Sequence, residues 1–253
     1  MSNLIDYLYE IIHHLKIKCK KIQPKIFFVH IPKTGGSTVI QAIGKAYSKK
    51  LQVHHIEGVL VDGVLDKKYE ICRFVSGHLP YLHSLKALFN SSEFNFISVV
   101  REPIQQFYSN VSYMREQDEN QIPPILLETY ARLKSLSLDE FVGSMSDFEV
   151  SFFSNPQSKT LSGIFDVESL PLEQLYGIIN SQFALLGTTE NLGTFLTKAS
   201  EMFNLGKIPL NLVVNRTKKK VPLLSENSPA FTHLENMLAV DIEIYRLISQ
   251  KNL

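Results

Sequence analysis

Cysteine is scarce in this chain. Only Cys19 and Cys72 occur among its 253 residues, and the residues around them lack the spacing of metal ligands. Two cysteines are also too few for the disulfide framework of a small secreted domain. Because Cys72 lies in an apolar run, we expect a buried free thiol and not half of a disulfide.

An excess of one charge is also missing. The formal net charge is +1, whereas a dedicated nucleic-acid-binding protein usually carries a marked basic excess. The near-neutral balance also argues against a large surface for highly sulfated polymers. We therefore expect no nucleic-acid partner. Any basic groove should be confined to a small part of the surface.

Long apolar runs are absent as well. No segment approaches the length of a membrane span, and the N-terminal residues lack the apolar region and cleavage site of a signal peptide. Residues 1–22 instead carry apolar side chains at helical spacing, followed by lysines. This pattern predicts an amphipathic helix packed on the domain, with a peripheral membrane contact through the lysines as the alternative. The expected compartment is the cytoplasm.

Short apolar runs alternate with helical patterns along the rest of the chain. This alternation predicts a single α/β domain over residues 1–253, a P-loop-like three-layer sandwich with a mostly parallel central sheet flanked by helices. The predicted strands are 26–31, 51–56, 71–76, 94–100 and 183–186.

Other segments have their own predictions. A helix is predicted at 37–47 and one closing helix at 228–250, whereas 59–68 is typical of a turn or a connection. Parallel strands end at a shared edge, where such sheets bind ligands. The loops expected to gather there follow Ile31, Ser76, Val100 and Leu186.

The loop after the first predicted strand has the composition of an anion site. It contains Lys33, then Thr34, Gly35, Gly36, Ser37 and Thr38. Backbone N–H groups at the start of a helix lack intrahelical partners, glycines permit close approach, and lysine and hydroxyl side chains add donors. The order differs from a Walker A loop because the lysine precedes the glycines, and no Walker B carboxylate is evident.

A second polar element follows the run 94–100. Arg101 leaves that strand, and Ser109 lies about two helical turns further on. An arginine fork with a hydroxyl can hold a phosphate. Together with the first loop, this pair predicts a nucleotide with two separated anionic groups.

These two elements together resemble the sulfotransferases that use 3′-phosphoadenosine-5′-phosphosulfate (PAPS). The likeness is greatest to the heparan sulfate 2-O-sulfotransferase branch and its bacterial relatives. The matching segments are His30–Thr38 and Val99–Ser109, with weaker matches at Asn155–Gly163, Leu186–Glu190 and Asn215–Thr217.

The resemblance implies a role for each matching residue. Lys33 would neutralise the leaving phosphate oxygen, and Thr34, Gly35, Gly36, Ser37 and Thr38 would hold the 5′-phosphosulfate. Arg101 and Ser109 would hold the 3′-phosphate. The residues expected to close over the nucleotide are Arg216, Thr217 and Lys218.

The acceptor hydroxyl also needs a base, for which His78 is the candidate. It follows a predicted strand and matches a Gly-His position of the same branch, and an imidazole accepts protons near neutrality. His55 and Glu57 are the alternatives. We expect His83 to lie on the surface and His30 to be a strand-end residue.

The expected activity is sulfuryl transfer from PAPS to a hydroxyl, with a carbohydrate as acceptor, 3′-phosphoadenosine-5′-phosphate (PAP) as product and no required metal. A nucleotide-dependent phosphotransferase and a catalytically silent nucleotide-binding module are the alternatives. Acceptor recognition is expected in the variable loops 52–68 and 118–137.

Overall fold

The computed structural model describes residues 23–62, 64–88, 91–209 and 221–251. Two predictions fall outside these ranges. One is the amphipathic helix over residues 1–22, and the other is the set of nucleotide contacts assigned to Arg216, Thr217 and Lys218. Within the described ranges, every helix is too short or too polar to cross a membrane.

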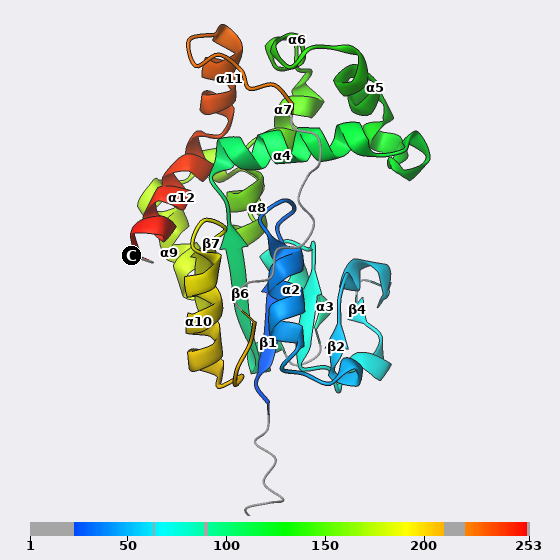
Figure 1. Cartoon of the computed structure of the whole chain (residues 1–253), viewed down its shortest axis with the longest axis vertical. Coiled ribbons are helices and arrows are strands. Elements are labelled where there is room, and N and C mark those ends of the chain that lie inside the picture. The colour runs from blue at the N-terminus through cyan, green and yellow to red at the C-terminus, as the bar shows by residue number, and fades with distance from the viewer. Residues whose placement is uncertain (1–22, 63, 89–90, 210–220, 252–253) are drawn as a thin grey trace, which may run out of the picture.

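A five-stranded sheet lies at the centre of the molecule (Figure 1). Its strand order is β2-β5-β1-β6-β7, and all neighbouring strands are parallel. The prediction of a parallel sheet flanked by helices is therefore confirmed. The strands are β1 (Lys25–Val29), β2 (Gln52–Val53), β5 (Phe74–Gly77), β6 (Phe94–Val100) and β7 (Leu185–Thr188).

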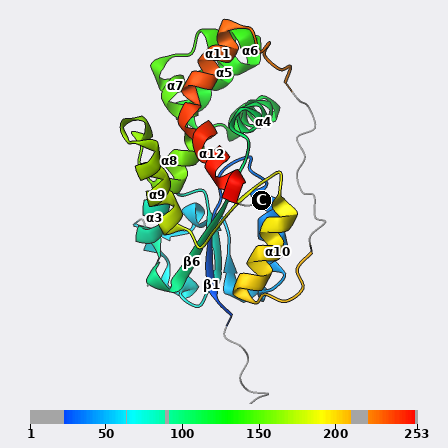
Figure 2. The same cartoon turned by 90° about the vertical axis from the view of Figure 1, so that its left-hand side faces the viewer.

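Alternate residues of the central strand β1 face opposite sides of the sheet, as the period of a strand requires. Ile26 and Phe28 pack in one core with α2 and α10, whereas Phe27 and Val29 pack in a second core with α3, α8, α9 and α12. Figure 2 shows α10 on one side of the sheet and α3 and α9 on the other. These helices are α2 (Gly36–Gly44), α3 (Tyr81–Ala87), α8 (Pro156–Ser162), α9 (Leu172–Gln182), α10 (Leu192–Phe203) and α12 (Ala239–Lys251).

A third core lies beyond the carboxyl edge of the sheet, within a cluster of helices that we call the helical cap (Figure 1). Val111, Leu133, Phe141 and Leu234 are buried in it, and each comes from a different helix. The cap consists of α4 (Pro103–Glu116), α5 (Leu127–Ser135), α6 (Leu138–Gly143), α7 (Asp147–Phe153) and α11 (Pro229–Met237).

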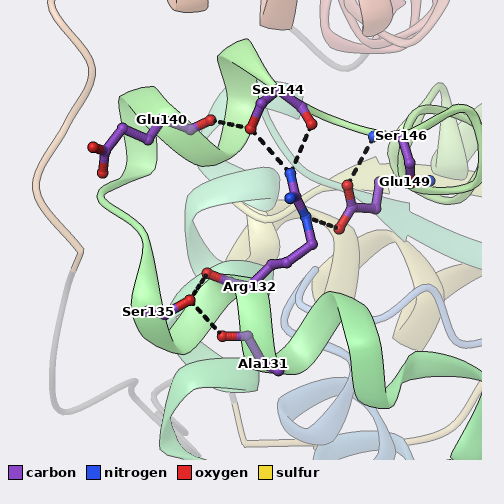
Figure 3. Close-up of polar contacts among 7 residues, drawn as sticks. All are labelled: Ala131, Arg132, Ser135, Glu140, Ser144, Ser146 and Glu149. Atoms are coloured by element: carbon purple, nitrogen blue, oxygen red, sulfur yellow. Dashed lines mark hydrogen bonds and ion pairs between the residues drawn. The ribbon is translucent and has the colours of Figure 1, made fainter.

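An ion pair joins helices of the helical cap (Figure 3). Arg132 Nε on α5 lies 3.1 Å from Glu149 Oε1 on α7, and Glu149 is almost fully buried. The other oxygen of Glu149 accepts from the backbone N–H of Ser146, which completes a Ser-x-x-Glu capping box. Arg132 also donates to the carbonyl and hydroxyl of Ser144. The ion pair and the hydrogen bonds around it thus hold α7 against α5.

The predicted connection at 59–68 is wrong in one respect, because it contains a short antiparallel pair. The strands are β3 (Leu60–Val61) and β4 (Val64–Leu65), with Leu60 paired to Leu65. Asp62 has a φ of 50°, the left-handed backbone of a tight turn. The turn residues were visible in the sequence, but the strands on either side are too short to give a pattern.

The predicted single closing helix at 228–250 is also wrong. It is divided into α11 and α12 at Leu238, whose backbone (φ −104°, ψ 10°) departs from the helix. Leu234 is buried in the helical cap, whereas Ile244 and Ile248 are buried against the sheet. The change of direction allows one apolar stripe to reach two separate cores.

Candidate functional site

The carboxyl edge of the parallel sheet gathers the predicted site residues. The loops after β1, β5, β6 and β7 all leave this edge, as expected. β1 pairs with both β5 and β6, so the loop of Lys33 lies between His78 and Arg101 along the edge.

The loop between β1 and α2 has an unusual backbone. Lys33 has a φ of 67° and Gly35, the residue that caps α2, a φ of 81°. Lysine seldom adopts this left-handed conformation, whereas glycine does so readily. Gly36 is needed for another reason, because a Cβ at this position would lie 2.0 Å from Cδ2 of the His30 ring.

Four successive carbonyl groups of this loop accept hydrogen bonds from protein side chains. Because a trans peptide is planar, the N–H of each following residue points the opposite way. The amides of Lys33, Thr34 and Gly35 therefore face away from these partners. The bonds are Thr34 Oγ1 to Ile31 O at 2.9 Å, Gln106 Nε2 to Pro32 O at 3.0 Å, Arg101 guanidinium to Lys33 O at 3.2 Å and Thr189 Oγ1 to Thr34 O at 2.8 Å.

The side chains of the loop divide into two groups. Thr34 is fully buried, and its hydroxyl is used inside the loop, so only its amide can face a ligand. Thr38 is also buried, in the first turn of α2, and its N–H already donates to Gly35 O at 3.0 Å. Ser37 is half-buried in the same turn. The outward-facing amides of the loop, more than its hydroxyls, are thus the candidate donors to an anion. We call the loop of residues 33–38 the cradle.

Lys33 brings a positive charge to this cradle. Its Nζ lies 4.1 Å from the centre of the Tyr113 ring on α4, a cation–π contact. Partial burial lowers the pKa of Lys33, the neighbouring charge of Arg101 lowers it further, and Glu116 acts in the opposite direction. Two cations held together would both gain from an anion between them.

Arg101 is fixed at its backbone by a side chain from α8. The N–H of Arg101 donates to Gln157 Oε1 at 2.9 Å, and Gln157 Nε2 donates to the Arg101 carbonyl at 2.8 Å. Gln157 and Ser158 in turn donate their backbone N–H groups to the buried carboxylate of Asp241 on α12. Arg101 thus leaves the sheet from a fixed position.

Ser109 lies half-buried on α4, two turns after the helix begins. Among the described residues, no hydrogen bond joins it to Arg101, whose guanidinium donates to Lys33 O. Arg101 is therefore hydrogen-bonded to the backbone of Lys33, and the predicted pair of Arg101 and Ser109 makes no direct contact of this kind.

The three candidate bases lie together at the end of β5. His78 Nδ1 lies 2.8 Å from the carbonyl oxygen of His30, and its backbone N–H donates to Glu57 Oε2 at 3.1 Å. His55 Nδ1 lies 3.4 Å from Glu57 Oε1. Location alone does not select one of the three.

The protonation state of its ring favours His78 as the candidate base. A carbonyl oxygen can only accept, so Nδ1 of His78 carries the proton and Nε2 carries the lone pair. Burial lowers the pKa of His78, against opposing effects from Glu57 and the His30 carbonyl. A neutral imidazole with a fixed tautomer is the state that a general base requires. His55, by contrast, is largely exposed.

Sequence reasoning underestimated His30. Its ring is buried, lies 4.2 Å from that of His78, and packs on Gly36. Burial, and then the charges of His78 and His55, lower its pKa to about 3. The pairing of Val29 with Gly77 places His30 beside His78, and that register was not readable from the sequence.

Gln106, Gln157 and Thr189 were also missed as supports of the site. Gln157 and Thr189 do fall within the weaker matches to the sulfotransferase pattern, which was the available signal. His83 lies exposed on α3, as expected.

Comparison with known proteins gives no match. No protein-family model matches this chain, and neither does any curated protein.

Proposed function

We propose that the protein is a PAPS-dependent O-sulfotransferase that acts on a hydroxyl of a carbohydrate. The observation that carries the proposal is the bond from the Arg101 guanidinium to the Lys33 carbonyl, which couples two cationic strand ends across a row of outward-facing amides. A nucleotide with phosphate groups at both its 3′ and 5′ positions needs such a pair of sites. A P-loop-like arrangement of β1, loop and α2 is part of the same proposal.

The residues of the loop would hold the 5′-phosphosulfate. The amides of Thr34 to Ser37, with the hydroxyls of Ser37 and Thr38, would donate to its oxygens, because the Thr38 N–H is already bonded to Gly35 O. Arg101 and Ser109 would hold the 3′-phosphate. The fit rests on the donor set, since the carbonyl groups of the loop are already satisfied by the protein and the two cations adjoin it.

The reaction would need one proton acceptor and one charge stabiliser. The acceptor oxygen would bond to sulfur while the bond from sulfur to the bridging phosphate oxygen breaks. His78 Nε2 would take the acceptor proton. Lys33 would neutralise the charge that builds on the bridging oxygen. PAP would then leave as product.

The helical cap gives a reason to expect a large acceptor. α4 begins directly after Arg101, and its Tyr113 contacts Lys33, so the cap adjoins the cradle. Tyr113 is partly exposed, and in a chain without tryptophan tyrosine is a natural surface for sugar stacking. A carbohydrate chain lying between the cap and the end of β5 would place one hydroxyl near His78.

The first test measures nucleotide recognition by thermal shift. PAP should raise the melting temperature clearly more than AMP, which lacks the 3′-phosphate, and more than ATP with Mg²⁺. Arg101→Ala should abolish the difference between PAP and AMP. Equal responses to PAP and AMP would refute the assignment of Arg101, and a response to Mg·ATP alone would favour a phosphotransferase.

A further inference from the structure

A cluster of metal-binding side chains lies beside the cradle, at the ends of β2 and β5. Its members are His55, Glu57 and His78, and one ligand atom from each lies within 4.8 Å of the other two. His55 and Glu57 come from the 3-10 turn that follows β2, and His78 from the loop that follows β5. Two segments of the chain therefore supply the cluster, and both are fixed to the same sheet.

The hydrogen bonds around the cluster orient its donor atoms. Nδ1 of His78 is occupied by the His30 carbonyl, so Nε2 is the atom that can bind a metal. Glu57 uses Oε2 to accept the N–H of His78, and its Oε1 lies 3.4 Å from His55 Nδ1. Metal-ligating histidines are usually held in this way, with the second ring nitrogen donating to a carbonyl or carboxylate.

His30 adds an independent observation. Its side chain is buried, its Nδ1 has no hydrogen-bond partner among the described residues, and its ring lies 4.2 Å from that of His78 and 6.3 Å from that of His55. His30 is thus packed against both histidines of the cluster without being one of its ligands.

We propose that His55, Glu57 and His78 bind a divalent zinc ion. Two imidazoles and one carboxylate form a ligand set that suits Zn²⁺, with a fourth position left for water, whereas Mg²⁺ and Ca²⁺ prefer oxygen ligands throughout. Zinc–ligand distances of about 2.0–2.2 Å require ligand atoms closer together than 4.8 Å. Side-chain rotation of the exposed His55 and Glu57 can supply this contraction.

Zinc binding has a consequence that rests on the proposed function. The metal would occupy the Nε2 lone pair of His78, which is the pair that accepts the proton of the acceptor hydroxyl. Zinc would therefore inhibit sulfuryl transfer and leave PAP binding intact, because Lys33 and Arg101 lie outside the cluster.

Direct zinc binding is measured on the full chain after chelator treatment, by competition with a chromogenic zinc indicator. We expect one Zn²⁺ per chain and, with Co²⁺ as a probe, the visible absorption of a tetrahedral N/O site. His55→Ala and Glu57→Gln should each weaken zinc binding at least about 10-fold, because substitution of residues that only hydrogen-bond to metal ligands already has an effect of this size. His83→Ala, which removes an exposed histidine outside the cluster, should have no effect.

Two outcomes would overturn the site. One is absence of stoichiometric zinc uptake by the wild type, and the other is unchanged uptake by the His55→Ala/Glu57→Gln double variant. Neither readout requires transfer activity, so the zinc site can fail while the sulfotransferase assignment holds, or the reverse. If zinc is bound and transfer proceeds at the same rate, the inhibitory role is refuted.

Discussion

The ends of β1 and β6 lie side by side at the carboxyl edge, but different contacts support them. Next to β1 are a left-handed Lys33, a group of neighbouring imidazoles, and His30 Nδ1, which has no hydrogen-bond partner in the described part of the chain. Next to β6, Gln157 makes two hydrogen bonds to the backbone of Arg101.

The support of β6 continues into a network of hydrogen bonds around Asp241. Asp241 accepts from the N–H groups of Gln157 and Ser158, its own N–H donates to Asn155, and Asn155 donates to Glu168. Buried hydrogen-bonded groups such as the Asp241 carboxylate give rigidity, whereas a strained backbone such as that of Lys33 is typical of functional sites. Under the proposed function, the end of β6 would therefore provide fixed recognition, and the ends of β1 and β5 would provide the groups that react.

The largest expected effect comes from His78→Ala. Removal of a general base should lower kcat by about 10²–10⁴-fold while PAP affinity is unchanged. Steady-state kinetics with PAPS, together with calorimetric titration of PAP, separate the two quantities. His83→Ala serves as the control and should behave as wild type. Normal turnover by His78→Ala would move the base to His55 or Glu57.

Lys33→Ala tests the charge on the β1 side. Loss of a group that stabilises developing charge should reduce transfer by about 10²–10³-fold, with weaker PAP binding in addition. Lys45→Ala is a matched control, because Lys45 is exposed at the far end of α2. If both variants lose activity equally, the effect of Lys33 is not local.

Asp241→Asn tests the β6 side. The amide can offer only one oxygen to the two N–H groups that now share a carboxylate, so we expect a loss of about 1–3 kcal/mol in the free energy of unfolding. PAP affinity should fall as well, because Gln157 would no longer hold Arg101 in place. Urea unfolding and calorimetric titration provide the two readouts. Reduced stability with unchanged PAP affinity would show that the network does not position Arg101.

The smallest expected effect is on the pH dependence of stability, where the two regions act in opposite directions. In the folded chain the pKa of His30 is about 3, whereas its usual value is 6.5. Between pH 6.5 and 3 the unfolded chain therefore binds more protons at this residue than the folded chain does. The free energy of unfolding consequently falls as the pH drops through this range. Burial raises the pKa of Asp241 from 3.8 to about 6, so its contribution is present below 3.8 and is lost as the pH rises to 6.

Between pH 3.8 and 6 the two contributions therefore oppose each other. Asp241→Asn removes one of them, so its unfolding free energy should rise more steeply with pH in this range than that of the wild type. Urea unfolding at half-unit pH intervals measures the two slopes. A shallower slope in the variant would contradict the assignment.

The sequence predicted the parts of the molecule that local patterns control. The alternation of Ile26 to Val29 and the density of apolar residues in 94–100 identified the central strands, and the order of Lys33 and the glycines identified the turn from β1 into α2. The strand order depends on long-range pairing, which no local pattern encodes. The break at Leu238 depends on two cores that exist only after folding.

The supports of the site were harder to predict for the same reason. Gln157 and Asp241 are 84 positions apart and meet only because α8 and α12 pack together. His30 and His78 meet through the register of β1 and β5. Residue types at strand ends thus identified the candidate reacting groups, whereas the groups that position them required the fold.

Transfer of labelled sulfate from PAPS to a panel of glycans and small hydroxylated molecules tests the central claim most directly. The account predicts labelled product with at least one carbohydrate acceptor, formation of PAP in equal amount, no requirement for Mg²⁺ and loss of product in Lys33→Ala and His78→Ala. Tight PAP binding without transfer to any acceptor, or product formation that persists in both variants, would contradict it.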